Sequence, residues 1–553
     1  MILLPLLAGL IAGPALGAAA SHSRLHSRLN TRSTSDSPTV NTTYGMVLGT
    51  TSEYRDDVSV FKGIPYAASP TGSLRWKPPA EPEAWSGVYN ATAFKTECAQ
   101  SYSSAGIFSS GSYDTGEDCL FLNIWRPKNA SETAKLPVYV WIYGGRFTGG
   151  SGDVVTYDGS GLATKDIIVV TFNYRLGPFG FLAHPDLSAE SAHNSSGNYG
   201  VLDMIAAIQW VQSEISSFGG NPDQITVGGQ SAGSAGALDM MYSPLATGLV
   251  SGVISESGAR GPHDPQTACV ATSYREKAAA EAYGVSLLSE MNISTIAELR
   301  NVSTDTLLNY DSVSDTILEG TPYENVSAFM APPEWRPVVD GYVLTHGYGD
   351  ALRLNAHSDV PILTGNNKDE SGASTSPGLT VETFTTQYTE MFGNLSSAFF
   401  KLYPANNDSQ ADDSSNALFR DMSRIGTWKW ALDWAAGGAE SNVYTYYWPH
   451  SPPNQTSGAY HGSELFYVFN NLPYSDPDTP WATEDYTIEE RMAGYWANFI
   501  KTGNPNGGNL TYWPPSGNDT KTMWLGDSWG ADSIADSTRI AFWEKFYTVS
   551  KEW

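Results

Sequence analysis

The feature that most constrains the fold of this chain is the segment 218–233, which ends in Gly229-Gln230-Ser231-Ala232-Gly233. Residues 224–227 alternate polar and apolar side chains and include β-branched ones, which predicts a short strand. The residues from Ser231 onward predict a helix. A serine on a sharp strand-to-helix turn, flanked by glycines because the two backbones pass closely, is typical of a nucleophile elbow. The N-terminus of the helix favours negative charge that develops beside the serine.

A second match to the same Gly-x-Ser-x-Gly pattern, at residues 526–530, lacks this context. Ser528 lies on no predicted strand-to-helix turn, and no histidine follows it in the chain. Because glycine and serine are common residues, an isolated match of this kind arises by chance. We therefore predict that Ser231, and not Ser528, is the nucleophile.

Short apolar runs predict strands that are buried on both faces of a sheet, at residues 138–142, 167–172, 252–255, 361–364 and 443–448. Apolar residues also recur at helical spacing, which predicts a helix that packs one stripe on the sheet: Met204, Ile208, Val211 and Ile215. Strands that alternate with helices indicate an α/β fold with a mostly parallel sheet.

The N-terminus resembles a targeting segment. Residues 1–20 contain no charged side chain, and Ala15-Leu16-Gly17 is a small-residue cleavage site after an apolar run too short to span a bilayer. This predicts a secretory signal peptide over residues 1–17. Residues 18–38 are poor in apolar side chains, so we expect a disordered segment or a pro-segment. No later stretch is long and apolar enough to span a membrane, so we expect no stable membrane insertion.

Charge and sequons agree with a secreted protein. The net charge of −27 repels phosphates, so we expect no nucleic-acid partner. Asn-x-Ser/Thr sequons are frequent, as in glycosylated extracellular proteins. The candidate asparagines are Asn41, Asn90, Asn129, Asn194, Asn292, Asn301, Asn325, Asn394, Asn407, Asn454, Asn509 and Asn518.

Residues 218–233 resemble the serine signature of the type-B carboxylesterase/lipase family, the group that includes the cholinesterases and fungal lipases. Residues 117–125 are similar to its second signature, and further similarity extends from about residue 39 to residue 546. The resemblance implies an α/β-hydrolase fold, in which a large, mostly parallel central sheet carries helices on both faces. It implies a single domain over residues 39–553.

The same resemblance implies several structural pairs. Cys119 lies in the second signature, and in the family this cysteine forms a disulfide with an upstream one, here Cys98. Cys269 has no partner left, so we expect it to be free and buried, the alternative being a bond between chains. Two buried ion pairs are implied as well: Arg75 with Glu117, and Arg175 with Asp203.

Ester hydrolysis by a serine needs a histidine base and a carboxylate that orients it, in the chain order Ser, acid, His for this fold. Residues 458–465 follow a predicted strand and resemble the histidine loop of the family, which identifies His461. Many carboxylates lie between Ser231 and His461, so position alone does not choose the acid. Residues 365–370 resemble the acid loop of the family, which favours Glu370 over its neighbour Asp369. The chain has no His-Glu-x-x-His motif and no Cys/His cluster, so we expect no metal and no cofactor.

Residues 143–147 follow a predicted strand and resemble the glycine-rich oxyanion loop of the family. A phosphate-binding loop is the rival interpretation, but no Gly-Lys-Ser/Thr follows. The backbone N–H groups of Gly145, Arg146 and Ala232 are the expected oxyanion donors, each worth roughly 3 to 4 kcal/mol.

Two residues depart from the family pattern. Arg146 stands where relatives usually have glycine, and Gln230 stands where they usually have glutamate. The guanidinium of Arg146 has two possible courses. It lines the acyl or alcohol side of the site and favours carboxylate-bearing esters, or it points to solvent or to an acidic neighbour. Gln230 makes the local field less attractive to cations.

These observations predict a secreted serine carboxylesterase that acts on small-molecule esters. A triacylglycerol lipase of the same family is the first alternative. The loop between Cys98 and Cys119, which forms the lid in family lipases, is short and rich in serine and glycine, which disfavours that alternative. This loop also lacks the cation-binding tryptophan of the cholinesterases. A non-catalytic adhesion homologue is the second alternative, and such homologues lack one or more triad residues.

Overall fold

The computed structural model describes residues 37–101, 106–108, 114–269 and 273–553. Backbone contacts divide the chain into two units, Met1–Ser37 and Pro38–Trp553. The signal peptide expected over residues 1–17 and almost all of the segment 18–38 lie outside the described residues.

The buried apolar runs of the sequence form the middle of an 11-stranded sheet, in the order β18-β17-β16-β15-β12-β11-β9-β10-β8-β4-β3. In chain order its strands are β3 (Thr50–Thr51), β4 (Val58–Pro65), β8 (Phe121–Pro127), β9 (Leu136–Ile142), β10 (Ile168–Phe172), β11 (Gly220–Gln230), β12 (Gly252–Glu256), β15 (Ile362–Asn367), β16 (Val443–Trp448), β17 (Lys521–Trp524) and β18 (Gly530–Ser533). All neighbours from β10 to β17 pair in parallel, while β8, β4, β3 and β18 add antiparallel edges. The predicted α/β-hydrolase fold is confirmed.

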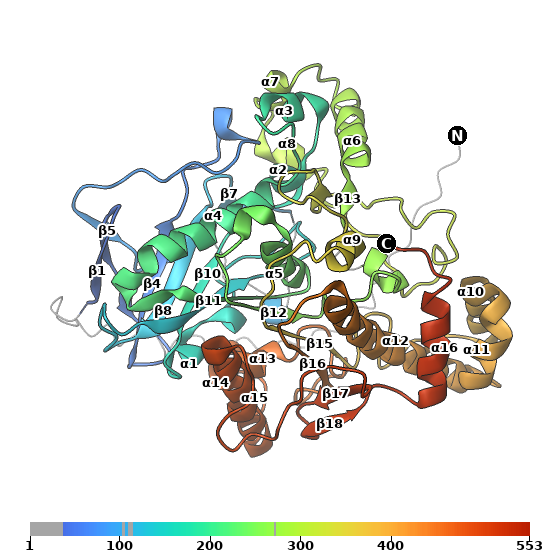
Figure 1. Cartoon of the computed structure of the whole chain (residues 1–553). Coiled ribbons are helices and arrows are strands. Elements are labelled where there is room, and N and C mark those ends of the chain that lie inside the picture. Colours follow the sequence, from blue (N-terminus) through green and yellow to red (C-terminus); the bar gives the residue numbers. More distant parts are fainter. Residues whose placement is uncertain (1–36, 102–105, 109–113, 270–272) are drawn as a thin grey trace, which may run out of the picture. The chain divides into compact units, whose positions relative to one another are not determined.

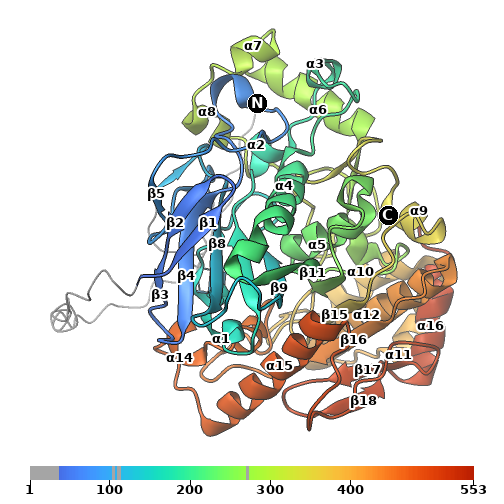
Figure 2. The ribbon, with the colours of Figure 1, turned by 60° about the vertical axis from the view of Figure 1, so that its left-hand side comes forward.

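The helices flank this sheet (Figures 1 and 2). Their bounds are α1 Ser160–Ala163, α2 Gly177–Phe181, α3 Pro185–Glu190, α4 Tyr199–Glu214, α5 Ala232–Tyr242, α6 Lys277–Glu290, α7 Ile296–Leu299, α8 Thr304–Leu308, α9 Tyr348–Arg353, α10 Val381–Phe392, α11 Ser396–Leu402, α12 Asp408–Gly437, α13 Leu465–Val468, α14 Leu472–Ser475, α15 Thr483–Thr502 and α16 Ser537–Tyr547. In Figure 1, α4 and α5 lie above the strands, and α1, α14 and α15 lie below them. No described helix is long and apolar enough to cross a membrane.

The apolar stripe predicted from helical spacing belongs to α4, and all of its members are completely buried: Met204, Ile208, Val211 and Ile215, the last of these at the end of the helix. Fully burying one such side chain contributes about 1.5 to 3 kcal/mol, which explains why this helix is fixed on the sheet. On the other side of the sheet, α15 packs against β9 and β11. The two layers hold β11, the strand that leads to Ser231, between them.

Strand β11 is longer than the segment 224–227 that its alternating pattern predicts, because it continues through two glycines to Gln230. These glycines are needed for close approach and do not end the strand. A Cβ on Gly228 would lie 2.2 Å from the Tyr139 hydroxyl oxygen, and one on Gly229 would lie 2.2 Å from the Gly233 carbonyl oxygen. Glycine in a strand often marks such a contact.

The structural pairs implied by the family resemblance are present in the structure. A disulfide joins Cys98 and Cys119, and Cys269 is buried and free. Two buried ion pairs are each held by two hydrogen bonds: Arg75 with Glu117, and Arg175 with Asp203, the second with both side-chain contacts at 2.7 Å. Smaller sheets join β1 (Thr39–Thr42), β2 (Gly45–Leu48) and β5 (Val88–Asn90), β6 (Glu97–Cys98) and β7 (Thr115–Gly116), and β13 (Arg275–Glu276) and β14 (Val338–Val339).

Candidate active site

Ser231 lies on the turn between β11 and α5, with backbone angles of φ 59° and ψ −123°. A non-glycine residue at positive φ is uncommon and costs of the order of 1 to 3 kcal/mol, and such strain clusters at functional sites. The turn is held by a hydrogen bond from the Ser231 N–H to the Glu256 carbonyl, at 3.0 Å. A Cβ on Gly233 would lie 2.0 Å from the Ile142 carbonyl oxygen, so the start of α5 fits against β9 only because this residue is glycine. The sequence pattern thus builds a turn that presents one hydroxyl at the end of the sheet.

The two expected partners of Ser231 follow neighbouring parallel strands. Glu370 lies in the loop after β15 and His461 in the loop after β16, while Ser231 follows β11 in the same sheet. Because carboxyl ends of parallel strands meet at one edge of a sheet, residues far apart in sequence come together there. All three side chains line one cavity.

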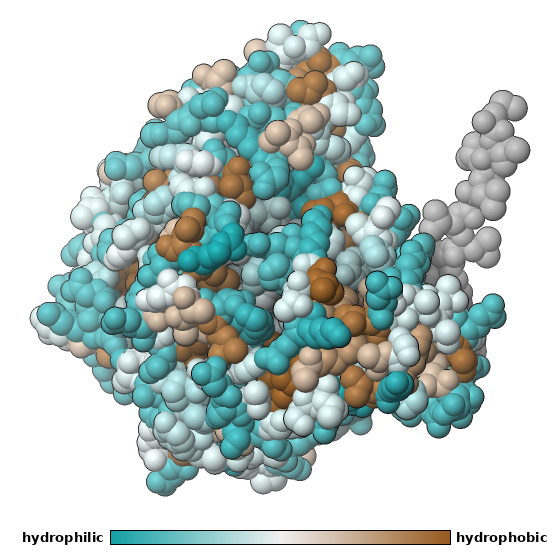
Figure 3. All heavy atoms as spheres, turned by 45° about the vertical axis from the view of Figure 1, so that its right-hand side comes forward, coloured by the Kyte–Doolittle hydropathy of each residue, from teal (hydrophilic) through white to brown (hydrophobic). Residues whose placement is uncertain are grey.

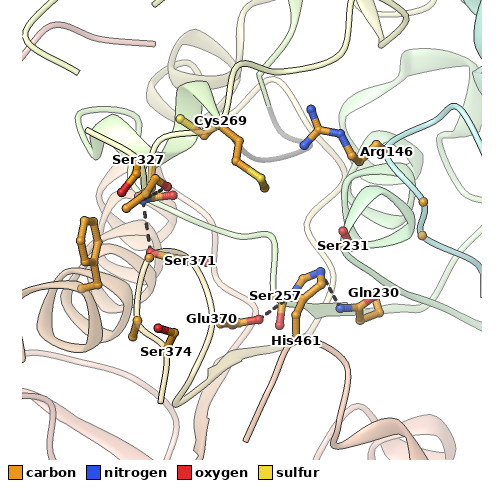
Figure 4. A pocket seen from close by; sticks show the side chains of 18 of the residues that line it. Arg146, Gln230, Ser231, Ser257, Cys269, Ser327, Glu370, Ser371, Ser374 and His461 are labelled. Atoms are coloured by element: carbon orange, nitrogen blue, oxygen red, sulfur yellow. Dashed lines mark hydrogen bonds and ion pairs between the residues drawn. The ribbon is translucent and has the colours of Figure 1, made fainter. Parts of the chain in front are cut away.

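Glu370 and His461 form a short hydrogen bond, with 2.6 Å between His461 Nδ1 and Glu370 Oε2. The other carboxylate oxygen, Oε1, accepts a hydrogen bond from the backbone N–H of Asn367 at 2.8 Å. The Glu370 side chain is 1% exposed, whereas that of His461 is 42% exposed. The carboxylate is therefore held in place by the backbone of its own loop, and the imidazole presents its Nε2 atom toward the cavity (Figure 4).

Asp369, the alternative acid, points elsewhere. Its Oδ1 atom forms an ion pair with Arg420, and its Oδ2 atom accepts the backbone N–H of Ala459 at 2.9 Å. The backbone of Asp369 also pairs with that of Tyr460. These contacts fasten the acid loop to the histidine loop, so Asp369 has a structural position beside the Glu370–His461 pair.

The Nε2 atom of His461 contacts Gln230, whose side-chain Nε2 lies 2.9 Å away. With the Nδ1 proton donated to Glu370, the His461 Nε2 lone pair accepts this hydrogen bond. No hydrogen bond from the Ser231 hydroxyl is present among the described residues. A proton transfer from Ser231 to His461 would require the Nε2 atom of His461 to give up its hydrogen bond with Gln230 and to form one with Ser231, and catalytic hydrogen bonds often tighten only when substrate binds.

The glycine-rich loop after β9 passes directly beside Ser231. A Cβ on Gly144 would lie 2.6 Å from the Gln230 carbonyl oxygen and 3.0 Å from Ser231 Cβ. Neither the Gly145 N–H nor the Ala232 N–H, at the first position of α5, donates to a protein acceptor in the described part of the chain. Buried N–H groups are seldom left without an acceptor, so these donors are suited to an oxyanion.

Arg146 keeps its backbone N–H in this loop and adopts φ 59°, a conformation that glycine would take without strain. Its side chain lines the cavity, and Nη2 donates to the Ala331 carbonyl at 2.7 Å. The side chain therefore borders the cavity that also contains Ser231, and which esters it favours stays a prediction.

The cavity has a volume of about 550 Å³, which is in the range of small-molecule sites. Apolar side chains form part of its wall, including Phe108, Phe147, Met330 and Phe419. Hydroxyl groups form another part, including Ser327, Ser371 and Ser374, which Figure 4 shows on the side away from Ser231. In the part of the chain that the structure describes, no cluster of His, Cys, Asp or Glu could hold a metal ion.

Two buried carboxyl groups close to Ser231 and to the Glu370–His461 pair were not expected from the sequence. Glu256 ends β12 and accepts a hydrogen bond from the Trp496 indole at 2.9 Å, and Glu464 accepts one from Asn367. Both are completely buried. Burial raises the pKa of Glu256 to about 8 and raises that of Glu464 well above its usual value. Glu464 lies within residues 458–465, which resemble the histidine loop. Carboxylates are so frequent in this chain, however, that its sequence position alone does not single it out.

The pKa of His461 sets the pH dependence of any base catalysis at this site. Burial acts to lower this pKa, but the hydrogen bond and negative charge of Glu370, helped by Glu464, raise it above the ordinary value of about 6.5. Only the neutral imidazole can take a proton from Ser231. We therefore expect kcat/KM to rise with pH through a midpoint above pH 6.5, as measured on a neutral ester.

Gln230→Glu tests this interpretation of the contact. A carboxylate beside Nε2 favours the imidazolium ion, so the midpoint of the pH–rate profile should move to higher pH. Gln230→Met removes the hydrogen bond without adding charge and serves as the control. A midpoint that stays in place in Gln230→Glu, with the protein folded, contradicts this account of His461.

The sequence profile of the carboxylesterase family matches residues 36–543 of the chain. The chain is 37% identical over 475 residues to fumonisin B1 esterase from Sphingopyxis macrogoltabida, covering 84% of this chain and 83% of that protein. It is 34% identical over 505 residues to para-nitrobenzyl esterase from Bacillus subtilis (strain 168), covering 88% and 94%. Carboxylesterase 1D from Mus musculus is 31% identical, covering 92% of this chain and 93% of that protein. A solved structure of PNB esterase superposes with a TM-score of 0.73 at 31% identity, covering 91% of this chain and 99% of the other.

Proposed function

The chain belongs to the carboxylesterase family, and we propose that it is a secreted serine carboxylesterase that works through an acyl-enzyme on Ser231. The observation that carries this proposal is the fixed Glu370–His461 pair in the same cavity as the strained Ser231. Its relatives are carboxylic ester hydrolases, which agrees with the chemistry of this site.

The geometry supports the following course of reaction. Ser231 Oγ attacks the ester carbonyl while His461 Nε2 takes its proton, and Glu370 stabilises the imidazolium ion that forms. The N–H groups of Gly145, Arg146 and Ala232 receive the negative charge on the carbonyl oxygen. The alcohol leaves with the proton from His461. Water, activated by the same base, then releases the acid and restores the Ser231 hydroxyl.

A dissolved short ester fits this site better than an oil surface. The loop between Cys98 and Cys119 spans only 21 positions in sequence, and its residues 102–105 and 109–113 lie outside the described residues. Its Phe108 lines the cavity and lies near Gly462, the residue after His461. On the face shown in Figure 3, apolar side chains form small groups separated by polar ones. That face therefore offers no broad, unbroken apolar area of the kind that marks a membrane contact.

The test that separates esterase from lipase is the rate of tributyrin hydrolysis across the solubility limit of tributyrin. We expect a smooth saturating curve, together with activity on p-nitrophenyl esters of short acids and little on long-chain triacylglycerols. A sharp rise in rate where droplets appear, with good turnover of long chains, would establish the lipase alternative.

Secretion and glycosylation are supported by the positions of the sequons. All of the candidate asparagines, from Asn41 to Asn518, are exposed, as sugar attachment requires. When the complete chain is expressed in a eukaryotic host, we expect it in the medium, beginning after Gly17 and losing apparent mass on enzymatic removal of N-glycans. A protein that stays in the cell with Met1 intact contradicts this proposal.

A further inference from the structure

The cavity around Ser231 differs in charge from the protein as a whole. The chain carries a net charge of −27. Among the described residues that line the cavity, however, Glu370 is the single carboxylate, and it is bonded to His461. Two arginines, Arg146 and Arg336, line the same cavity. The described lining of the cavity is thus richer in cationic than in anionic side chains, although the protein as a whole is strongly negative.

The two arginines differ in their surroundings. Arg336 is 1% exposed and donates hydrogen bonds to Asp315, to Ser273 and to the Pro333 carbonyl, so its position is structural. Arg146 lies in the oxyanion loop itself and is partly exposed. Figure 4 shows its guanidinium on the cavity wall above Ser231, directed toward the side on which Cys269 lies. The contact of Nη2 with the Ala331 carbonyl fixes the orientation of the planar group.

The position of Arg146 in the oxyanion loop places its positive charge close to the ester bond of a bound substrate. Its backbone N–H belongs to the loop that faces the ester carbonyl oxygen, so its side chain starts next to the reacting group. A guanidinium held there can reach a second substituent that lies only a few bonds from the scissile ester. Gln230 also favours an anionic substrate, because this fully buried residue beside Ser231 is a neutral amide and adds no negative charge that would repel a carboxylate.

We propose that the preferred substrates are esters that carry an ionised carboxylate a few bonds from the scissile bond, and that Arg146 binds this carboxylate. This inference rests on the proposed function, because it assigns the substrate class of the same site. Arginine is suited to the role, since its planar fork binds a carboxylate through two charge-assisted hydrogen bonds. Burial in a cavity strengthens such a pair relative to one at the surface.

The experiment compares anionic esters with neutral esters of nearly the same shape. Monoethyl succinate is paired with ethyl levulinate, in which an acetyl group replaces the carboxylate on the acyl side. 3-Acetoxypropanoate is paired with 4-acetoxybutan-2-one, which makes the same change on the alcohol side. The readout is the ratio of kcat/KM for the anionic ester to that for its neutral partner, followed by acid release.

The variants are Arg146→Gln, which keeps the backbone N–H and a polar side chain but removes the charge, and Arg146→Lys, which keeps the charge but not the fork. Arg353→Gln removes an exposed arginine outside the cavity and controls for net charge. We expect the ratio for at least one pair to fall by about tenfold or more in Arg146→Gln, to fall less in Arg146→Lys and to stay unchanged in Arg353→Gln.

The outcomes separate this inference from the proposed function. If the wild-type ratio exceeds one for either pair and falls in Arg146→Gln, the carboxylate site is established. If both ratios are unchanged in folded Arg146→Gln while ethyl levulinate is still hydrolysed, the inference is wrong and the esterase proposal stands. If the wild-type protein hydrolyses none of the four esters, the esterase proposal itself is overturned. Should Arg146→Gln fail to fold, the wild-type ratios at low and high salt decide, because screening weakens only a charge-based preference.

Discussion

Ser231→Ala should lower kcat by about five orders of magnitude while leaving the fold intact. Without the hydroxyl, no acyl-enzyme can form, and only binding and the oxyanion donors remain to assist direct attack by water. The structure also explains why the fold should survive. The Ser231 hydroxyl donates to no described residue, and the turn is held by the backbone N–H, which alanine retains.

The matched control for this variant is Ser528→Ala. Ser528 satisfies the same Gly-x-Ser-x-Gly pattern, but it is exposed between β17 and β18 and lies outside the cavity lining. Its replacement should change neither kcat nor the midpoint of thermal unfolding. Steady-state rates on p-nitrophenyl acetate, together with circular dichroism melts, measure both quantities. Near-normal turnover by Ser231→Ala would refute the covalent mechanism.

The fold was predictable from the sequence because burial on both faces of a parallel sheet leaves a strong signal. The run 443–448 coincides with β16, and the run 138–142 falls inside β9. Strand ends were less predictable, since they depend on close approach between elements. Gly228 and Gly229 look like the end of a strand in sequence, yet they continue β11 because they pair with β9 and β12. Both are glycines because Tyr139 and Gly233 leave no room for a Cβ.

The residues of the candidate site were predictable in part. Ser231 and His461 each lie in a motif that follows a predicted strand, and strand order alone brings such loops together. The choices of His461 and Glu370 also used the family resemblance, and for Glu370 position alone decided nothing, because carboxylates are frequent in this chain. The contact between Gln230 and His461 and the burial of Glu256 and Glu464 could not be predicted. They depend on side-chain directions that no sequence spacing specifies.

Glu370→Gln should lower kcat by roughly 10⁴-fold without unfolding the protein. The structure determines how the amide would sit. Oε1 of Glu370 accepts the Asn367 N–H, so the oxygen of the glutamine should take that place, and its NH₂ group should face His461 Nδ1. A donor at Nδ1 forces the histidine proton onto Nε2, and an Nε2 that already carries a proton cannot accept the one from Ser231.

Asp369→Asn is the control for Glu370→Gln, because it neutralises the adjacent carboxylate. Asp369 pairs with Arg420 and holds the backbone of Ala459, so its replacement should lower the midpoint of thermal unfolding and affect kcat far less than Glu370→Gln. Stopped-flow rates on p-nitrophenyl acetate and melting curves of both variants separate the two roles. The reverse pattern, with most activity lost in Asp369→Asn and little in Glu370→Gln, would make Asp369 the acid. In that case the short hydrogen bond between Glu370 and His461 would have a structural role only. Asp369 would then have to orient His461 indirectly, through its contact with the backbone of the histidine loop.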